Sequence, residues 1–119
     1  MDRERDIEVW LRRRIEDMGG VFWKFTSPGR AGVPDRLAVF PDGRVVFVEL
    51  KTETGRLTKL QKAVQKQLID LWQQVCTVYG MDGAREFLED VKNNCFILPV
   101  YAGDDIYDQV FDREEVMPK

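Results

Sequence analysis

A glutamate and a lysine, separated by one residue, end the most strongly β-prone segment of the chain, Val45 to Lys51. Side chains alternate between the two faces of a strand, so Glu49 and Lys51 share one face while Leu50 points to the other. The carboxylate can hold a divalent cation, and the ammonium can orient a water or offset charge on a phosphoryl group. The Leu50 carbonyl is a further oxygen ligand of the kind that magnesium favours. The triplet alone is weak evidence, because Glu-x-Lys also arises by chance.

A second carboxylate, Asp35, follows a glycine-rich loop and starts the strand that we expect over residues 34–40. A short turn should join this strand to the next one as a hairpin. That turn would set Phe40 opposite Val45 and therefore bring Asp35 near Leu50.

Asp35 and Glu49 would then meet at the same end of neighbouring strands. Two carboxylates so close together repel each other unless a cation or a proton neutralises them. This convergence makes a metal site the better interpretation, although an aspartate beside glycine and proline can also serve only to cap a turn.

The composition excludes several kinds of catalytic site. None of the 119 residues is a histidine, which rules out Ser-His-Asp and Cys-His triads and zinc sites that need imidazole. No apolar run approaches the roughly 20 residues that span a bilayer, and the charged N-terminus is unlike a secretory signal. Cys76 and Cys95 lie far apart, and we expect both to be buried free thiols. Hydrolytic chemistry would have to rest on carboxylates, lysine and a metal.

The charge divides the chain into two parts. Residues 1–95 hold 16 basic and 15 acidic side chains, a net of +1, whereas residues 96–119 hold two basic and six acidic ones, a net of −4. We therefore expect one domain over 1–95 and a tail over 96–119. The tail begins with the apolar stretch 96–101, so we expect it to pack on the domain or on a partner subunit.

The periodicity along residues 1–95 predicts the order α-β-β-β-α-β-α, an α/β fold in which helices flank a small mixed sheet. Asp6 is the expected N-cap of the first helix, and Thr58 to Gln61 forms a capping box for the long central helix. The expected elements are a helix over 6–18, strands over 21–26, 34–40, 45–51 and 76–79, and a last helix over 82–92. The central helix should bury one stripe of apolar residues, Leu57, Leu60, Val64, Leu68, Leu71 and Val75.

Two segments, Gly32 to Leu37 and Phe47 to Lys51, resemble the motifs of the PD-(D/E)XK nuclease superfamily, and most closely its VRR-NUC group. The likeness extends over about residues 7–93. It implies a restriction-endonuclease-like α-β-β-β-α-β core and a phosphodiesterase that uses Mg²⁺ or Mn²⁺. Stand-alone members occur in phages and bacteria, which implies the cytoplasm of a bacterial or phage-infected cell.

The resemblance also assigns roles to single residues. Asp35 and Glu49 match the metal-binding carboxylates, and Lys51 matches the catalytic lysine. Glu8 matches a first-helix glutamate that completes the metal site, although a helix dipole also favours an acid there. Gln61 matches a glutamine on the helix after the lysine strand, although capping also explains it.

Basic side chains around this site are candidates for binding nucleic acid. Arg30 and Arg36 flank the expected scissile phosphate, Lys24 is close in sequence, and Lys59 and Lys62 lie on one face of the central helix. Such a helical stripe of lysines is more often a solvated face.

The function that we expect is a metal-dependent DNA endonuclease without an organic cofactor. Its substrate would be branched or flap DNA, because stand-alone members of the group resemble junction resolvases and a domain this small has little surface for reading bases. A homodimer would present two sites to such a substrate. The alternative is a non-catalytic nucleic-acid-binding or assembly module that keeps the nuclease fold. The presence of Asp35, Glu49 and Lys51 together favours the enzyme.

Overall fold

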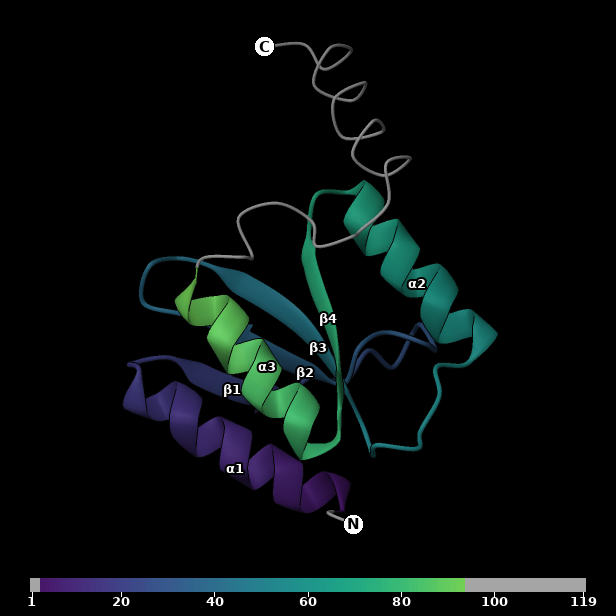
Figure 1. Cartoon of the computed structure of the whole chain (residues 1–119). Helices are drawn as coiled ribbons and strands as arrows, with labels where there is room; N and C mark the ends of the chain where they lie inside the picture. Colours follow the sequence, from purple (N-terminus) through teal and green to yellow (C-terminus); the bar gives the residue numbers. More distant parts are fainter. Residues whose placement is uncertain (1–2, 94–119) are drawn as a thin grey trace, which may run out of the picture.

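The computed structural model describes residues 3–93, so that Cys95 and the tail from residue 96 lie outside the described residues. The elements follow the expected order α-β-β-β-α-β-α (Figure 1). They are α1 (Glu4–Asp17), β1 (Val21–Lys24), β2 (Arg36–Val39), β3 (Val45–Lys51), α2 (Lys59–Asp70), β4 (Gln74–Tyr79) and α3 (Gly80–Lys92). The expected α/β class is therefore confirmed.

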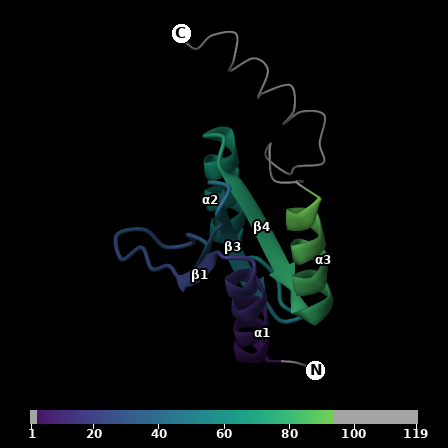
Figure 2. The ribbon, with the colours of Figure 1, turned by 90° about the vertical axis from the view of Figure 1, so that its left-hand side faces the viewer.

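The four strands form one mixed sheet in the order β1-β2-β3-β4. Strands β1, β2 and β3 are joined by antiparallel pairing, and α2 makes the crossover to β4, which lies parallel to β3. Helices α1 and α3 pack against each other and against the sheet, whereas α2 lies on the other side of β4 from α3 (Figure 2). The sheet is thus a middle layer between one helix and a pair of helices.

The alternation along β3 separates the core from the candidate site. Val46, Val48 and Leu50 are buried in the main hydrophobic cluster together with residues of α1 and α3. Burying one such aliphatic side chain stabilises a fold by roughly 1.5–3 kcal/mol. Glu49 and Lys51 therefore face the opposite layer, toward α2. The rest of the cluster comprises Ile7, Leu11, Ile15, Phe22, Ala38, Phe40, Val78, Ala84, Phe87, Leu88 and Val91.

Cys76, on β4, agrees with the expectation of a free thiol. It lies against the core, and burial raises the pKa of its thiol to about 12, with the charges of Asp90 and Glu86 adding to the shift. The thiolate is thus essentially absent at neutral pH, and Cys76 behaves as a small core residue.

The hairpin register differs by one residue from the expected one. Val39, not Phe40, pairs with Val45, and Arg36 pairs with Val48. Phe40 continues this register just beyond the strand by donating its backbone N–H to the Arg44 carbonyl, at 2.9 Å, so the turn is one residue shorter than expected. The observed register brings Asp35 level with Glu49, and these are the two acids of the expected site.

The expected buried stripe of α2 was partly wrong. The helix buries Val64, Gln65 and Ile69, whereas Leu60 is 47% and Leu71 67% exposed. The three-and-four spacing of apolar residues continues past Asp70, where the helix ends, and Trp72 beyond it takes a positive φ of 68°. The face of α2 that packs on the sheet is therefore not the one that carries Leu60 and Leu71.

The start of α1 also differs from the expected one. The helix begins at Glu4, and Arg3 occupies the N-cap position that had been assigned to Asp6. The Asp6 carboxylate instead accepts the Arg3 backbone N–H from the first turn, at 3.3 Å. None of the helices within residues 3–93 has the length and apolarity needed to cross a membrane.

Candidate active site

The Glu49 side chain is the buried centre of the expected site. Only 5% of the residue is exposed. Burial and the negative charge of Asp35 together raise the pKa of its carboxyl from 4.5 to about 7, while the charge of Lys51 acts in the opposite direction. A carboxylic acid that is half protonated at neutral pH, with a second acid beside it, is typical of a functional site.

Asp35 is positioned by hydrogen bonds with backbone groups of its neighbours in the sheet. Its Oδ1 accepts the Leu50 N–H at 3.2 Å, and its carbonyl accepts the Phe25 N–H at 2.9 Å. These bonds join Asp35 to the strands on both sides of β2. The aspartate is therefore held at the end of β3, next to Glu49, and does more than cap a turn.

Lys51 completes the expected triad. Its Nζ lies 3.7 Å from Glu49 Oε2, and the side chain is 18% exposed, so the ammonium is at the mouth of the site rather than in bulk solvent. The loop after β3 packs on the lysine stem at Gly55, where an added Cβ would lie 3.1 Å from the Lys51 Cβ. Gly55 thus has a packing role that the sequence had not indicated.

Gln61 combines the two roles that its sequence position had left open. Its side-chain oxygen accepts the Thr58 N–H at 2.9 Å, and the Thr58 hydroxyl accepts the Gln61 N–H at 3.1 Å, which confirms the capping box. The amide nitrogen of the same side chain donates to Glu49 Oε2 at 3.4 Å. Capping therefore fixes the amide in an orientation that points a donor at the buried acid.

Gln61→Glu should separate these roles. Glutamate can still accept the Thr58 N–H, but it replaces a donor by a negative charge beside Glu49. We expect the cleavage rate to fall by a factor of about ten or more, while Thr58→Ala, which removes only the cap, lowers the melting temperature and largely spares the rate. Cleavage and thermal denaturation assays on both variants test this, and equal rates in wild type and Gln61→Glu would limit Gln61 to capping.

The first helix carries a second glutamate, Glu4, one turn before the expected Glu8. Glu4, in the first turn of α1, is the α1 carboxylate whose charge raises the pKa of Glu49. Glu8, one turn later, pairs with Arg12, with 3.3 Å between Oε1 and Nε. Both lie on one side of the helix, as residues four apart do, so both are candidates for the helix carboxylate of the site.

The donor set suits a hard divalent cation. No group of three or more His, Cys, Asp or Glu side chains gathers within residues 3–93 in the way a fully protein-enclosed metal site requires. Two adjacent carboxylates with a nearby backbone carbonyl are nevertheless what magnesium needs, because it keeps several waters and binds through one or two carboxylates. Such a cation would offset the mutual repulsion of the Asp35 and Glu49 carboxylates.

The expected nucleic-acid contacts divide into two groups. Lys59 and Lys62 are exposed on α2, and Lys24 is exposed on β1 beside its partner Arg36 in β2. Arg36 is turned inward, with a side chain that is 12% exposed and an Nη1 that lies 3.2 Å from Asp35 Oδ2. This arginine thus pairs with the aspartate of the site, and its contact with a phosphate stays a prediction.

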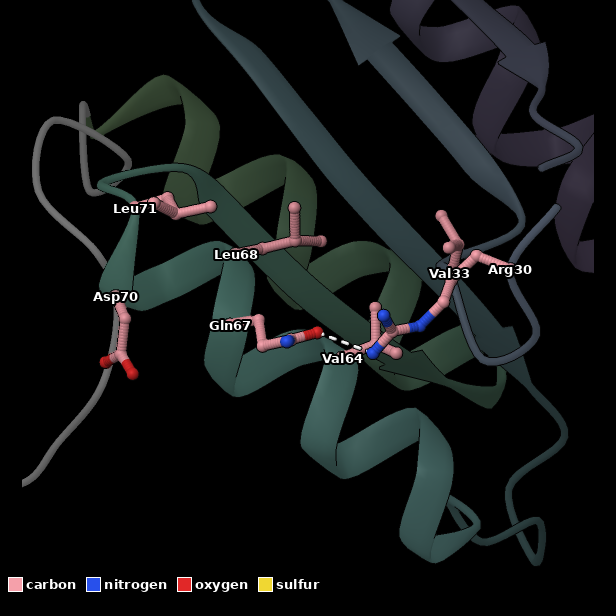
Figure 3. Close-up of a pocket in the computed structure, with 7 residues that line it drawn as sticks. All are labelled: Arg30, Val33, Val64, Gln67, Leu68, Asp70 and Leu71. Carbon is pink, nitrogen blue, oxygen red and sulfur yellow. Dashed lines mark hydrogen bonds between the residues drawn. The ribbon is translucent and has the colours of Figure 1, made fainter.

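Arg30 lies in a hollow between its loop and the outer side of α2 (Figure 3). The hollow has a volume of about 460 Å³ and includes none of the triad. Arg30 Nη2 donates to Gln67 Oε1 at 2.7 Å, which fastens the loop to the helix. Gly32, with φ +89°, lets the loop approach further, because a Cβ there would meet Leu60 Cγ at 2.8 Å.

Comparisons with known proteins agree with this geometry. No family model matches the chain. The curated protein "Putative nuclease p44" of Acyrthosiphon pisum secondary endosymbiont phage 1 is 40% identical over 80 residues, which are 67% of this chain and 86% of that protein. A solved structure described as a VRR_NUC domain superposes with a TM-score of 0.68 at 26% identity, and the match covers 72% of this chain and 94% of the other. Together with the triad at the end of β3, these similarities show that the chain belongs to the VRR-NUC nuclease family.

Proposed function

We propose that the protein is a Mg²⁺- or Mn²⁺-dependent DNA endonuclease whose site is formed by Asp35, Glu49 and Lys51. The observation that carries the proposal is the burial of Glu49 beside a second acid, with the Lys51 ammonium 3.7 Å away. Two carboxylates in such an arrangement destabilise the folded chain when no cation is present, and a bound cation would offset this cost.

Each group has a defined task in phosphodiester hydrolysis. Asp35, Glu49 and the Leu50 carbonyl would hold the cation, with Glu4 in place of Glu8 as the helix carboxylate. A bound divalent ion supplies charge neutralisation at the phosphoryl group and a more acidic water. The Lys51 ammonium would orient the attacking water and offset negative charge on the phosphoryl group.

Gln61 contributes at the Glu49 carboxylate. It donates from Nε2 to Oε2, which favours the ionised form that binds cations and fixes the direction of the free lone pairs. The side chain therefore orients a ligand, and its own capping bond to Thr58 keeps it in place.

A matched pair of variants tests the assignment on α1. Glu4→Gln should lower cleavage by at least about tenfold at limiting metal, because it removes a negative charge that faces the site. Glu8→Gln is the control on the same face, one turn away, and should stay within about twofold of wild type. Rates measured over a range of Mn²⁺ concentrations compare the two, and a loss confined to Glu8→Gln would restore the original assignment.

Branched or flap DNA is the substrate class that we propose, with a homodimer as the working species. The decisive experiment incubates the protein with branched, flapped and linear DNA, and with RNA of the same sequence, in Mg²⁺, Mn²⁺ or EDTA. Purified Glu49→Gln serves as the control for a contaminating nuclease, and light scattering with and without DNA gives the number of subunits. Binding of DNA without cleavage in either metal would favour a non-catalytic module.

A further inference from the structure

Gln65 is a polar residue at a core position of α2. Only 4% of it is exposed, between Val64 and the buried Ile69 on the face that packs on the sheet. Its Nε2 donates to Thr77 Oγ1 at 3.0 Å, and the Thr77 hydroxyl lies 3.4 Å from Gln65 Oε1, at which it can donate in return. The expected catalytic machinery does not include this pair.

The pair lies directly beside the candidate active site. Thr77 on β4 is the register partner of Glu49 on β3. Gln65 follows Gln61 by four residues, so that both side chains leave α2 on the same side. The helix is thereby joined to two adjacent strands at the same level, by Gln61 to Glu49 and by Gln65 to Thr77.

The Gln65–Thr77 pair affects the orientation of α2 more than the stability of the fold. A buried amide costs free energy unless its hydrogen bonds are made, and when they are made its net contribution is modest. An aliphatic residue would pack as well as Val64 and Ile69 do. Aliphatic contacts, however, are non-directional and tolerate a small rotation of the helix, whereas the Gln65–Thr77 pair fixes its angle about the helix axis.

We propose that Gln65 and Thr77 are positioning residues that hold α2 at the rotation at which Gln61 meets Glu49. The inference rests on the proposed nuclease function. The Gln61 donor lies 3.4 Å from Glu49, near the limit of a hydrogen bond, so a rotation that moved it by 1 Å would break the contact. Displacements of this size are costly in enzyme sites.

The first test removes the pair without leaving an unpaired group. Gln65→Leu combined with Thr77→Val replaces both partners by apolar groups of similar shape, a change that can be nearly neutral for stability. We expect kcat to fall about tenfold with little change in KM for DNA or in melting temperature. Thr77→Ser, which keeps the hydroxyl, should retain wild-type kcat. Wild-type kcat in the double variant, or an equal loss in Thr77→Ser, would overturn the proposal.

The second test asks whether the pair acts through Gln61. In a Gln61→Ala background, the double variant should cost less than about twofold more, because residues that act through one contact are not additive. Val64→Ala on the same face is the structural control, and it should lower the melting temperature with additive effects on kcat. Full additivity of the pair with Gln61→Ala contradicts a positioning role.

A readout without turnover separates this inference from the function on which it rests. In ¹H–¹⁵N spectra of the metal-free protein, the side-chain amide signal of Gln61 should shift in the double variant and stay in place in Val64→Ala. If the wild type cleaves no nucleic acid, the proposed function fails, and this signal still decides whether the pair orients Gln61. An unmoved Gln61 signal would overturn the pair's role even in an active enzyme.

Discussion

Glu49→Gln is expected to lose cleavage by a factor of about a hundred or more and to make the metal-free protein more stable above pH 7. The loss follows because glutamine offers a cation a neutral oxygen in place of a charged one. Asp35→Asn and Lys51→Ala should lose activity on a similar scale. Rates on the preferred DNA, with circular dichroism to confirm the fold, measure this, and undiminished turnover by Glu49→Gln would exclude the proposed site.

The stability gain follows from the sign of the pKa shift. The pKa of Glu49 is raised from 4.5 to about 7, so the folded state binds its proton more tightly than the unfolded state. The associated stability is fully present below pH 4.5 and is lost as pH rises through 7, a difference of about 3 kcal/mol. Glutamine cannot ionise, so its variant avoids this loss. Thermal unfolding in EDTA at pH 5 and pH 8 should show the gain only at pH 8.

Affinity for Mn²⁺ is expected to fall about tenfold for each pH unit below 7. One proton must leave Glu49 before its carboxylate can bind a cation, and below its pKa that proton competes directly with the metal. Calorimetry from pH 5 to pH 8 measures the affinity, and titrations in two buffers of different ionisation enthalpy at pH 6 should show close to one proton released per cation.

Glu49→Gln is the control for this experiment too. Its residual binding should be weak and should lack the proton release, since no group of raised pKa remains at that position. A wild-type affinity that did not change between pH 5 and pH 8 would contradict the binding of the cation by a Glu49 carboxyl of raised pKa.

The fold was largely predictable because its signals are local. The alternating run that ends at Lys51 and the capping box at Thr58 depend on neighbouring residues, and both appear as expected. The hairpin register was not predictable to one residue. It depends on the loop between β2 and β3, where Asp42 accepts the Arg44 N–H and Gly43 takes a φ of +91°. This turn geometry depends on contacts within the loop. The alternation of apolar residues in the two strands, from which the hairpin was predicted, does not determine it.

The convergence of Asp35, Glu49 and Lys51 was predictable for a similar reason, and Gln61 of α2 was also expected near them, but the other helix contacts were not. Strand alternation alone puts Glu49 and Lys51 on one face. Whether Glu4 or Glu8 reaches that face depends on where α1 begins relative to the strand ends, which is a tertiary property. The burial of Gln65 was not predicted, because the spacing of the leucines placed the buried stripe elsewhere. The sequence around Gln65 does not indicate its partner, because the hydrogen bond to Thr77 depends on how β4 packs on α2.

The alternation along β3 has a consequence for how the chain folds. A slip of β3 by one residue against its neighbours would exchange its two faces. Glu49 and Lys51 would then enter the cluster of α1 and α3, and Val48 and Leu50 would leave it. Desolvating two charges in that cluster costs several kcal/mol even when they are paired. The two charged groups that we propose for hydrolysis therefore also disfavour the nearest misfolded pairing. Variants that neutralise both Glu49 and Lys51 should form more of the slipped species during refolding, even where the native state is stable.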